Sequence, residues 1–285
     1  MRAFFLVALL LAGCMLKQEA PKPTPPPVRV PITGVVAIED LVAPGATSAL
    51  FYAAFRSKPQ AQATARQALL ATVAARPDAA PVCQIVNPQQ KTGPRPAAWL
   101  SVGTLVFGPA LQTTGTPVEP NDEHRYIKKL DPGFPAGVYN VAAKGLGDTP
   151  GFSATFSMPE AVSYVSLGGV RLDSGALKAR RNEPLVFGWR TPAVAHEANL
   201  DLIEIEGKRA GGEAVVLRCA AREMSVPVEA GDAKWVLTPD LASFAPKSRA
   251  RMFFLRAHIR DARSTYVDVQ LQGLRTHATM LDWED

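Results

Sequence analysis

Few residues in the sequence have the types and spacing that enzymatic chemistry requires. His196 and Glu197 begin like the zinc-binding helix of a metalloprotease, but that motif needs a second histidine at the position where this chain has Leu200. The G-x-S-x-G turn of many hydrolases does not occur, nor does S-x-x-K followed by K-T-G. The sequence therefore predicts no catalytic residues, no metal ligands and no cofactor. The remaining histidines are far apart in the chain, at His124, His258 and His277.

Two short segments could instead hold an ion or a phosphate group. Gly145, Gly147 and Gly151 are spaced like a phosphate-binding loop, but such a loop must lead into a helix, and residues 152–158 alternate like a strand. We therefore expect a hairpin loop there. Residues 121–124 gather polar side chains without the alternate carboxylates of a calcium loop, which favours a solvated turn.

Basic and aromatic residues offer a second kind of recognition. Two basic groups could meet acidic polymers or anionic headgroups, or could simply lie in solvated loops. The tryptophans could form a sugar-stacking platform, although three of them lie in strand-like runs and favour core packing. The last of them, close to the acidic end of the chain, could also form an exposed docking tail. The basic groups are Lys178, Arg180 and Arg181, and Lys247, Arg249 and Arg251; the tryptophans are Trp99, Trp189, Trp235 and Trp283.

Cys83 and Cys219 lie in separate apolar, strand-like stretches. In an oxidising compartment they could form a disulfide that joins the two halves of the chain, provided that their Cα atoms come within about 7 Å. The alternative is two buried thiols that act as small hydrophobic side chains. The sequence leaves both open.

The N-terminus has the pattern of a secretory signal. Arg2 precedes an apolar run over residues 4–12, which is too short to span a bilayer, and the run ends in Leu11-Ala12-Gly13-Cys14. This pattern resembles the lipobox of bacterial lipoproteins. The resemblance implies that residues 1–13 are a removed signal peptide and that acyl chains on Cys14 anchor the protein to a membrane. Met15, in place of an aspartate, implies sorting to the outer membrane, on a face that the sequence does not specify.

Residues 14–31 predict an extended linker. They contain six prolines and little to bury, so polyproline geometry would lift the folded part roughly 40 Å from the lipid over a dozen residues. A proline-rich ligand for a partner domain is the alternative use of this segment.

The rest of the chain favours short strands joined by turns. Apolar runs flank Pro44-Gly45, and apolar residues alternate with polar ones in 152–158 and 265–271. Leu185, Phe187 and Trp189 share one face of a further expected strand. We predict a mainly β protein with two tandem antiparallel β-sandwiches, over residues 32–162 and 163–285, and a short helix near residues 60–75. The 185–189 stretch resembles the middle of an immunoglobulin-like or fibronectin type III-like sandwich.

Composition and charge exclude some classes of function but do not identify one. Hydrophobic residues make up 47% and charged residues 20% of 285, as in folded proteins, and a net charge of +5 is too mild to indicate nucleic-acid binding. We therefore expect a non-catalytic envelope lipoprotein that binds or scaffolds envelope proteins, such as a subunit of a secretion or motility assembly. An envelope hydrolase or a glycan-binding protein is the alternative.

Overall fold

The described part of the chain is mainly β, as predicted. The computed structural model describes residues 29–57, 73, 81–87, 98–112, 114–190, 199–222, 232–238 and 240–284. The expected signal peptide, Cys14 and most of the linker lie outside these residues. So does the helix expected near residues 60–75, apart from Val73, which is helical and buried. No helix in the described ranges is long and apolar enough to cross a membrane.

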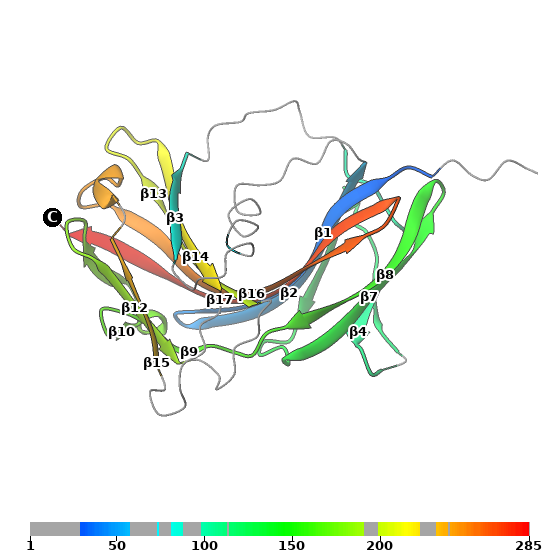
Figure 1. Ribbon diagram of the computed structural model, residues 1–285, viewed down its shortest axis with the longest axis horizontal. Helices are drawn as coiled ribbons and strands as arrows, with labels where there is room; N and C mark the ends of the chain where they lie inside the picture. The colour runs from blue at the N-terminus through cyan, green and yellow to red at the C-terminus, as the bar shows by residue number, and fades with distance from the viewer. Residues whose placement is uncertain are drawn as a thin grey trace, which may run out of the picture.

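A nine-stranded sheet forms the centre of the molecule (Figure 1). Its main order is β3-β14-β13-β16-β17-β1-β2-β6, and β11 pairs with the far end of β17. The two strands β1 and β2 flank the turn at Pro44-Gly45, as predicted. The strands are β1 (Ile32–Ala43), β2 (Ala46–Ser57), β3 (Val82–Val86), β6 (Tyr126–Leu130), β11 (Leu177–Arg180), β13 (Asn199–Lys208), β14 (Ala214–Arg222), β16 (Arg249–Arg263) and β17 (Val267–Glu284).

Two four-stranded sheets accompany the central sheet. One has the order β5-β4-β7-β8 and the other β10-β9-β12-β15, with the short helices η1 (Leu172–Ser174) and η2 (Leu241–Ser243) beside the second. Their strands are β4 (Leu105–Pro109), β5 (Thr116–Val118), β7 (Gly137–Leu146), β8 (Thr149–Met158), β9 (Ser163–Leu167), β10 (Val170–Arg171), β12 (Leu185–Arg190) and β15 (Asp232–Leu237).

Both small sheets pack on the same face of the central sheet. Alternate residues of a strand point to one face. On β17, Val269 and Leu271 join a core with Val141 of β7, while Leu281 and Trp283 have the same parity and join a second core. We call these the β7 core and the β12 core. In Figure 1 the small sheets accordingly lie under opposite ends of the central sheet, which curves upward at both ends.

The tandem immunoglobulin-like arrangement is not confirmed. The central sheet contains β1, β2, β3 and β6 from before residue 162 and β11, β13, β14, β16 and β17 from after it. The two cores therefore share one sheet. The reason is the length of β16 and β17, which have 15 and 18 residues and extend under both cores.

The opposite, concave face of the central sheet is also partly covered. Val73 packs there with Leu200, Leu202 and Leu255. Ala37, Ala257 and Leu274 form a smaller apolar group on the same face.

A polar layer separates the two cores along β16 and β17. Arg256 is fully buried and donates two hydrogen bonds of 2.9 Å, from Nε and Nη2, to the carboxylate of Asp201. Arg275 donates from Nη1 to Asp40 Oδ2 at 2.6 Å and from Nε to the Pro159 carbonyl at 2.9 Å. Pro159 lies in the segment that connects β8 to β9. Arg275 therefore holds the connection between the two small sheets against the central sheet.

We expect Asp201→Ala to lower the free energy of unfolding by about 3–5 kcal/mol, because it leaves the Arg256 guanidinium buried without its carboxylate. Urea denaturation followed by circular dichroism measures this loss. Asp261→Ala is the matched control. It removes the carboxylate that pairs with the exposed Arg263, so it should barely change the urea concentration at the midpoint of unfolding. Equal shifts for the two variants would contradict a structural role for the buried pair.

Candidate functional site

The parallel ladder between β1 and β17 stops where β1 reaches Pro44. The two strands pair from Ile32 opposite Val267 to Val42 opposite His277. Pro44 has no amide hydrogen with which to continue a ladder, and Gly45 turns the chain into β2 with a φ of +72°. On this side β17 next pairs with β11, beginning at Leu177 opposite Leu281. Among the described strands, none pairs with β17 here between His277 and Leu281.

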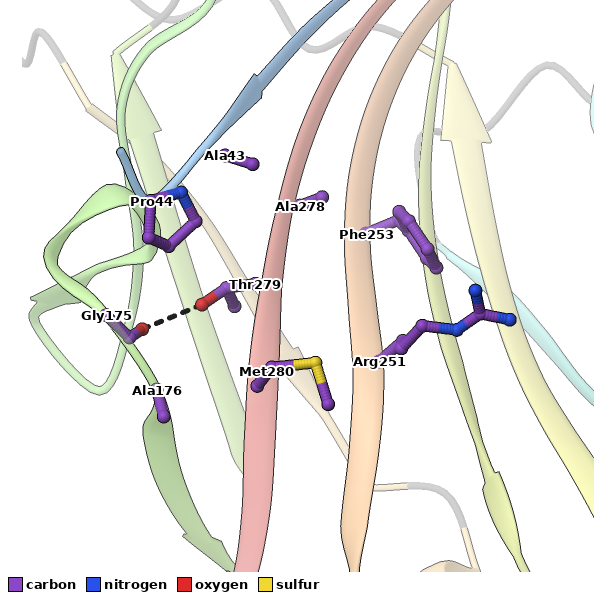
Figure 2. Close-up of a pocket in the computed structure, with 9 residues that line it drawn as sticks. All are labelled: Ala43, Pro44, Gly175, Ala176, Arg251, Phe253, Ala278, Thr279 and Met280. Atoms are coloured by element: carbon purple, nitrogen blue, oxygen red, sulfur yellow. Dashed lines mark hydrogen bonds between the residues drawn. The ribbon is translucent and has the colours of Figure 1, made fainter. Parts of the chain in front are cut away.

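An apolar hollow of about 320 Å³ opens at this break, on the concave face (Figure 2). Ala278 lies opposite Phe253, and Met280 lies opposite Arg251, in the β16–β17 register. The side chains nearest the break are small, which leaves space where a larger residue would fill it. The lining residues are Ala43, Pro44, Gly175, Ala176, Arg251, Phe253, Ala278, Thr279 and Met280. We call this site the β17 hollow.

Two polar contacts fix the rim of the β17 hollow. The Thr279 hydroxyl donates to the Gly175 carbonyl at 2.7 Å, which holds the segment before β11 against β17 (Figure 2). Arg251 Nη2 lies 2.6 Å from Glu206 Oε2, and the Arg251 side chain is 66% exposed. The hollow thus has apolar walls and one exposed guanidinium at its edge, an arrangement that suits an apolar group carried on a polar chain.

The structure brings the two predicted basic groups together at the C-terminal end of β17. Lys178 of β11 and Arg249 of β16 both lie opposite Asp282. Carboxylates accompany most of these cations, and Arg249 lowers the pKa of Asp282 by a hydrogen bond. No local pattern in the sequence indicates this pairing, which arises only when β17 enters the sheet. The ion pairs are Lys178–Glu284, Arg180–Glu183, Arg249–Asp282 and Arg251–Glu206; Arg181 donates to the Phe244 carbonyl, and Lys247 lies in the turn before β16.

The tryptophans belong mainly to the core. Trp189, Trp235 and Trp283 are buried in the β12 core, and the Trp99 ring is half-buried beneath the Arg56 guanidinium. A docking tail at Trp283 is therefore wrong. Residues 282–284 continue β17, and the Trp283 ring packs on Phe244 with centroids 5.2 Å apart.

Cys83 and Cys219 form a disulfide. They lie directly opposite each other in the antiparallel pair of β3 and β14, with their Cα atoms 4.0 Å apart. Because the two sulfur atoms are bonded, the alternative of two buried thiols is wrong; Cys219 is buried and Cys83 is exposed. The bridge fastens β3, the outermost strand, to the central sheet.

The two glycine- and polar-rich segments are turns, as predicted. Gly145 and Gly147 lie at the tip of the β7–β8 hairpin, which closes with Leu146 opposite Thr149. Asn121 Oδ1 accepts hydrogen bonds from the amides of Glu123 and Arg125, which closes the turn that contains His124. His196 and Glu197 lie outside the described residues.

The buried His258 and the partly buried His277 make structural contacts. His258 Nδ1 lies 3.1 Å from Asn199 Oδ1, and His277 Nε2 lies 3.0 Å from the Val162 carbonyl. Burial lowers the pKa of His277, and the hydrogen bond to Val162 opposes this effect only in part. In the described part of the chain, no three His, Cys, Asp or Glu side chains gather where they could hold a metal ion.

Comparison with known proteins adds no relative: no protein-family model matches the chain, and no curated protein matches its sequence.

The lowered pKa of His277 predicts that stability falls in mild acid. In the folded state the imidazole stays neutral below its ordinary pKa of about 6.5, whereas in the unfolded chain it binds a proton there. Its contribution is therefore present above about pH 6.5 and is lost as the pH falls toward the folded pKa. Unfolding free energies measured from pH 7.5 to pH 5 should fall less steeply for His277→Gln than for the wild type. If the unfolding free energies of the two proteins fell in parallel with pH, His277 would not be the cause of the loss of stability in acid.

Proposed function

We propose that this protein is a non-catalytic lipoprotein of the bacterial cell envelope that binds a protein partner in the β17 hollow. Acyl chains on Cys14 anchor it to the outer membrane, and the proline-rich segment after Cys14 carries the folded part away from the lipid. The observation that carries the proposal is the break in the β1–β17 ladder, which leaves an apolar hollow on the concave face.

The form of the hollow supports an extended polypeptide segment as the occupant. Its volume of about 320 Å³ suits one or two apolar side chains. The exposed Arg251 at its edge suits an acidic or polar residue that precedes or follows the inserted side chain. We therefore assign to the partner an apolar residue beside an acidic one, presented on a chain that lies across β16 and β17.

The contacts of the buried and partly buried ionisable residues favour a binding role over catalysis. Asp201 and Asp40 accept hydrogen bonds from buried arginines, and His258 and His277 contact Asn199 and the Val162 carbonyl. These contacts serve the polar layer between the cores. The β17 hollow itself is lined by one hydroxyl, that of Thr279, which already donates to Gly175.

A photo-crosslinking amino acid at Ala176 tests the hollow. Ala176 is exposed and lines the hollow, while Ala242 on η2 is also exposed and lies elsewhere, which makes it the matched control. We expect crosslinks from position 176 to join an apolar residue next to an acidic one in a single envelope protein. They should disappear when Ala278→Phe fills the hollow.

The same capture from both positions, or capture that survives Ala278→Phe, would contradict binding in the hollow. Thermal unfolding of each variant verifies that the fold is intact.

Fractionation of cells tests the anchor separately. We expect Cys14→Ala to move the protein from the membrane pellet to the soluble fraction and to abolish labelling by radioactive palmitate, because the acyl chains supply the membrane affinity. Met15→Asp should keep the label but shift the protein from the outer to the inner membrane. Retention of the Cys14→Ala protein in the pellet would contradict lipid anchoring, whatever the outcome of the crosslinking.

A further inference from the structure

A groove of about 590 Å³ lies between the edge strand β8 and the end of β16. One wall is β8 from Gly151 to Thr155, and the other is β16 from Arg260 to Arg263. Arg260 Nη1 donates across the groove to Thr155 Oγ1 at 2.7 Å. Figure 1 shows β8 beside the hairpin of β16 and β17. We call this groove the β8 seam.

Both walls of the β8 seam are strand edges. β8 pairs with β7 on one side, and β13 pairs with β16 only as far as Asn199 opposite His258. Residues 259–263 of β16 therefore pair with β17 alone. Within the described ranges, no strand pairs with the outer edge of β8 or with this end of β16 on the side away from β17. Two strand edges that lack a ladder partner thus border one groove.

The floor of the β8 seam is the flank of the β7 core. Phe152, Ala154 and Ala262 line the seam, are partly buried and pack against that core. Val267 belongs to the core and also lines the seam. The groove therefore exposes apolar side chains between two polar backbone edges.

The seam interrupts the enclosure of the β7 core. The β5-β4-β7-β8 sheet and the central sheet from β16 to β6 cover this core from opposite sides. Near β5 and β6, a β-bridge between Pro120 and Tyr126 links the two layers. Between β8 and β16, the side chain of Arg260 takes the place of such a backbone bridge.

The edge of β8 lacks the residues with which edge strands usually avoid pairing with other chains. Residues 151–157 contain no charged residue and no proline. By contrast, the edge strand β6 carries Lys128 and Lys129, and β15 carries Asp232 and Lys234. An uncharged edge beside an apolar floor is suited to pairing with another strand.

We infer that the β8 seam binds an extended segment of a partner protein, which adds to the edge of β8 as a further strand. One edge of the segment pairs with β8, its other edge faces residues 259–263, and alternate side chains contact Phe152 and Ala154. The wall from Gly151 to Thr155 is about 16 Å long at the usual rise, so the segment needs about five residues, alternately apolar and polar. This surface is separate from the β17 hollow and recognises backbone instead of a single side chain.

Fluorescence anisotropy with the full-length protein tests strand addition with a defined probe. The probe is a labelled seven-residue peptide in which threonine alternates with valine, and the control is the same peptide with a methyl group on each valine nitrogen. Methylation keeps the side chains but removes the backbone donors along one edge of the peptide. The probe should bind, and the control should bind about tenfold more weakly. Absence of probe binding, or equal binding of the two peptides, would overturn the inference.

Hydrogen exchange measured by mass spectrometry locates the bound probe. Amides of residues 151–155 and 259–263 should exchange more slowly in its presence, because both walls become covered. Amides of β6, which also lies at the edge of a sheet, should be unchanged. Protection confined to residues 278–280 would place the probe in the β17 hollow, and equal protection of β6 would show unselective edge pairing; either result would contradict binding in the seam.

Two substitutions obstruct the groove. Ala262→Phe fills its floor, and Ser264→Trp places a large ring at its exposed rim, in the turn after β16. Each should weaken binding of the probe about tenfold. Ala142→Phe is the matched control, because Ala142 lies between the core residues Val141 and Ala143 on β7 and points away from the core. Undiminished binding to Ser264→Trp, or equal weakening by Ala142→Phe, would refute the assignment.

Discussion

The antiparallel pairing of β16 with β17 is the interaction on which the rest of the structure depends. Its register runs from Arg249 opposite Asp282 to Arg263 opposite Asp268, a length of roughly 50 Å at the usual rise per residue. Residues of one parity along this pair face both small sheets, and residues of the other parity line the concave face. A slip of one residue would exchange these faces and expose both cores, so the pairing fixes the whole architecture at once.

The length of this pair also creates the features that are specific to this protein. Two cores under one sheet must be separated where the small sheets end, and the buried Arg256–Asp201 and Arg275–Asp40 pairs occupy that interval. Gly273 lies in the same interval, where β8 passes so close that a Cβ atom would lie 2.2 Å from the Ser157 carbonyl oxygen. Because β17 extends beyond the end of β1, the sheet also has a break, and the β17 hollow opens there.

The surface chemistry divides between two faces. At the C-terminal end of β17, cations of β11 and β16 form ion pairs with Asp282 and Glu284 of β17. These pairs balance much of the positive charge within the fold. On the concave face, by contrast, the β17 hollow has apolar walls.

The sequence by itself determined the features that depend on local pattern. Alternation at period two predicts the strands at 152–158 and 185–189, Pro44-Gly45 predicts the turn between β1 and β2, and the glycines at 145–147 predict a hairpin tip. The expected lipid anchor at Cys14 also rests on the sequence alone. Only the tertiary structure decided which strands pair: β1 lies beside β17 from the other end of the chain, β3 brings Cys83 opposite Cys219, and one sheet crosses the expected boundary at residue 162. The physical reason is that a strand's pattern specifies which side chains are buried but not which backbone edge completes its hydrogen bonds. The β17 hollow and the polar layer both arise from that choice of partners.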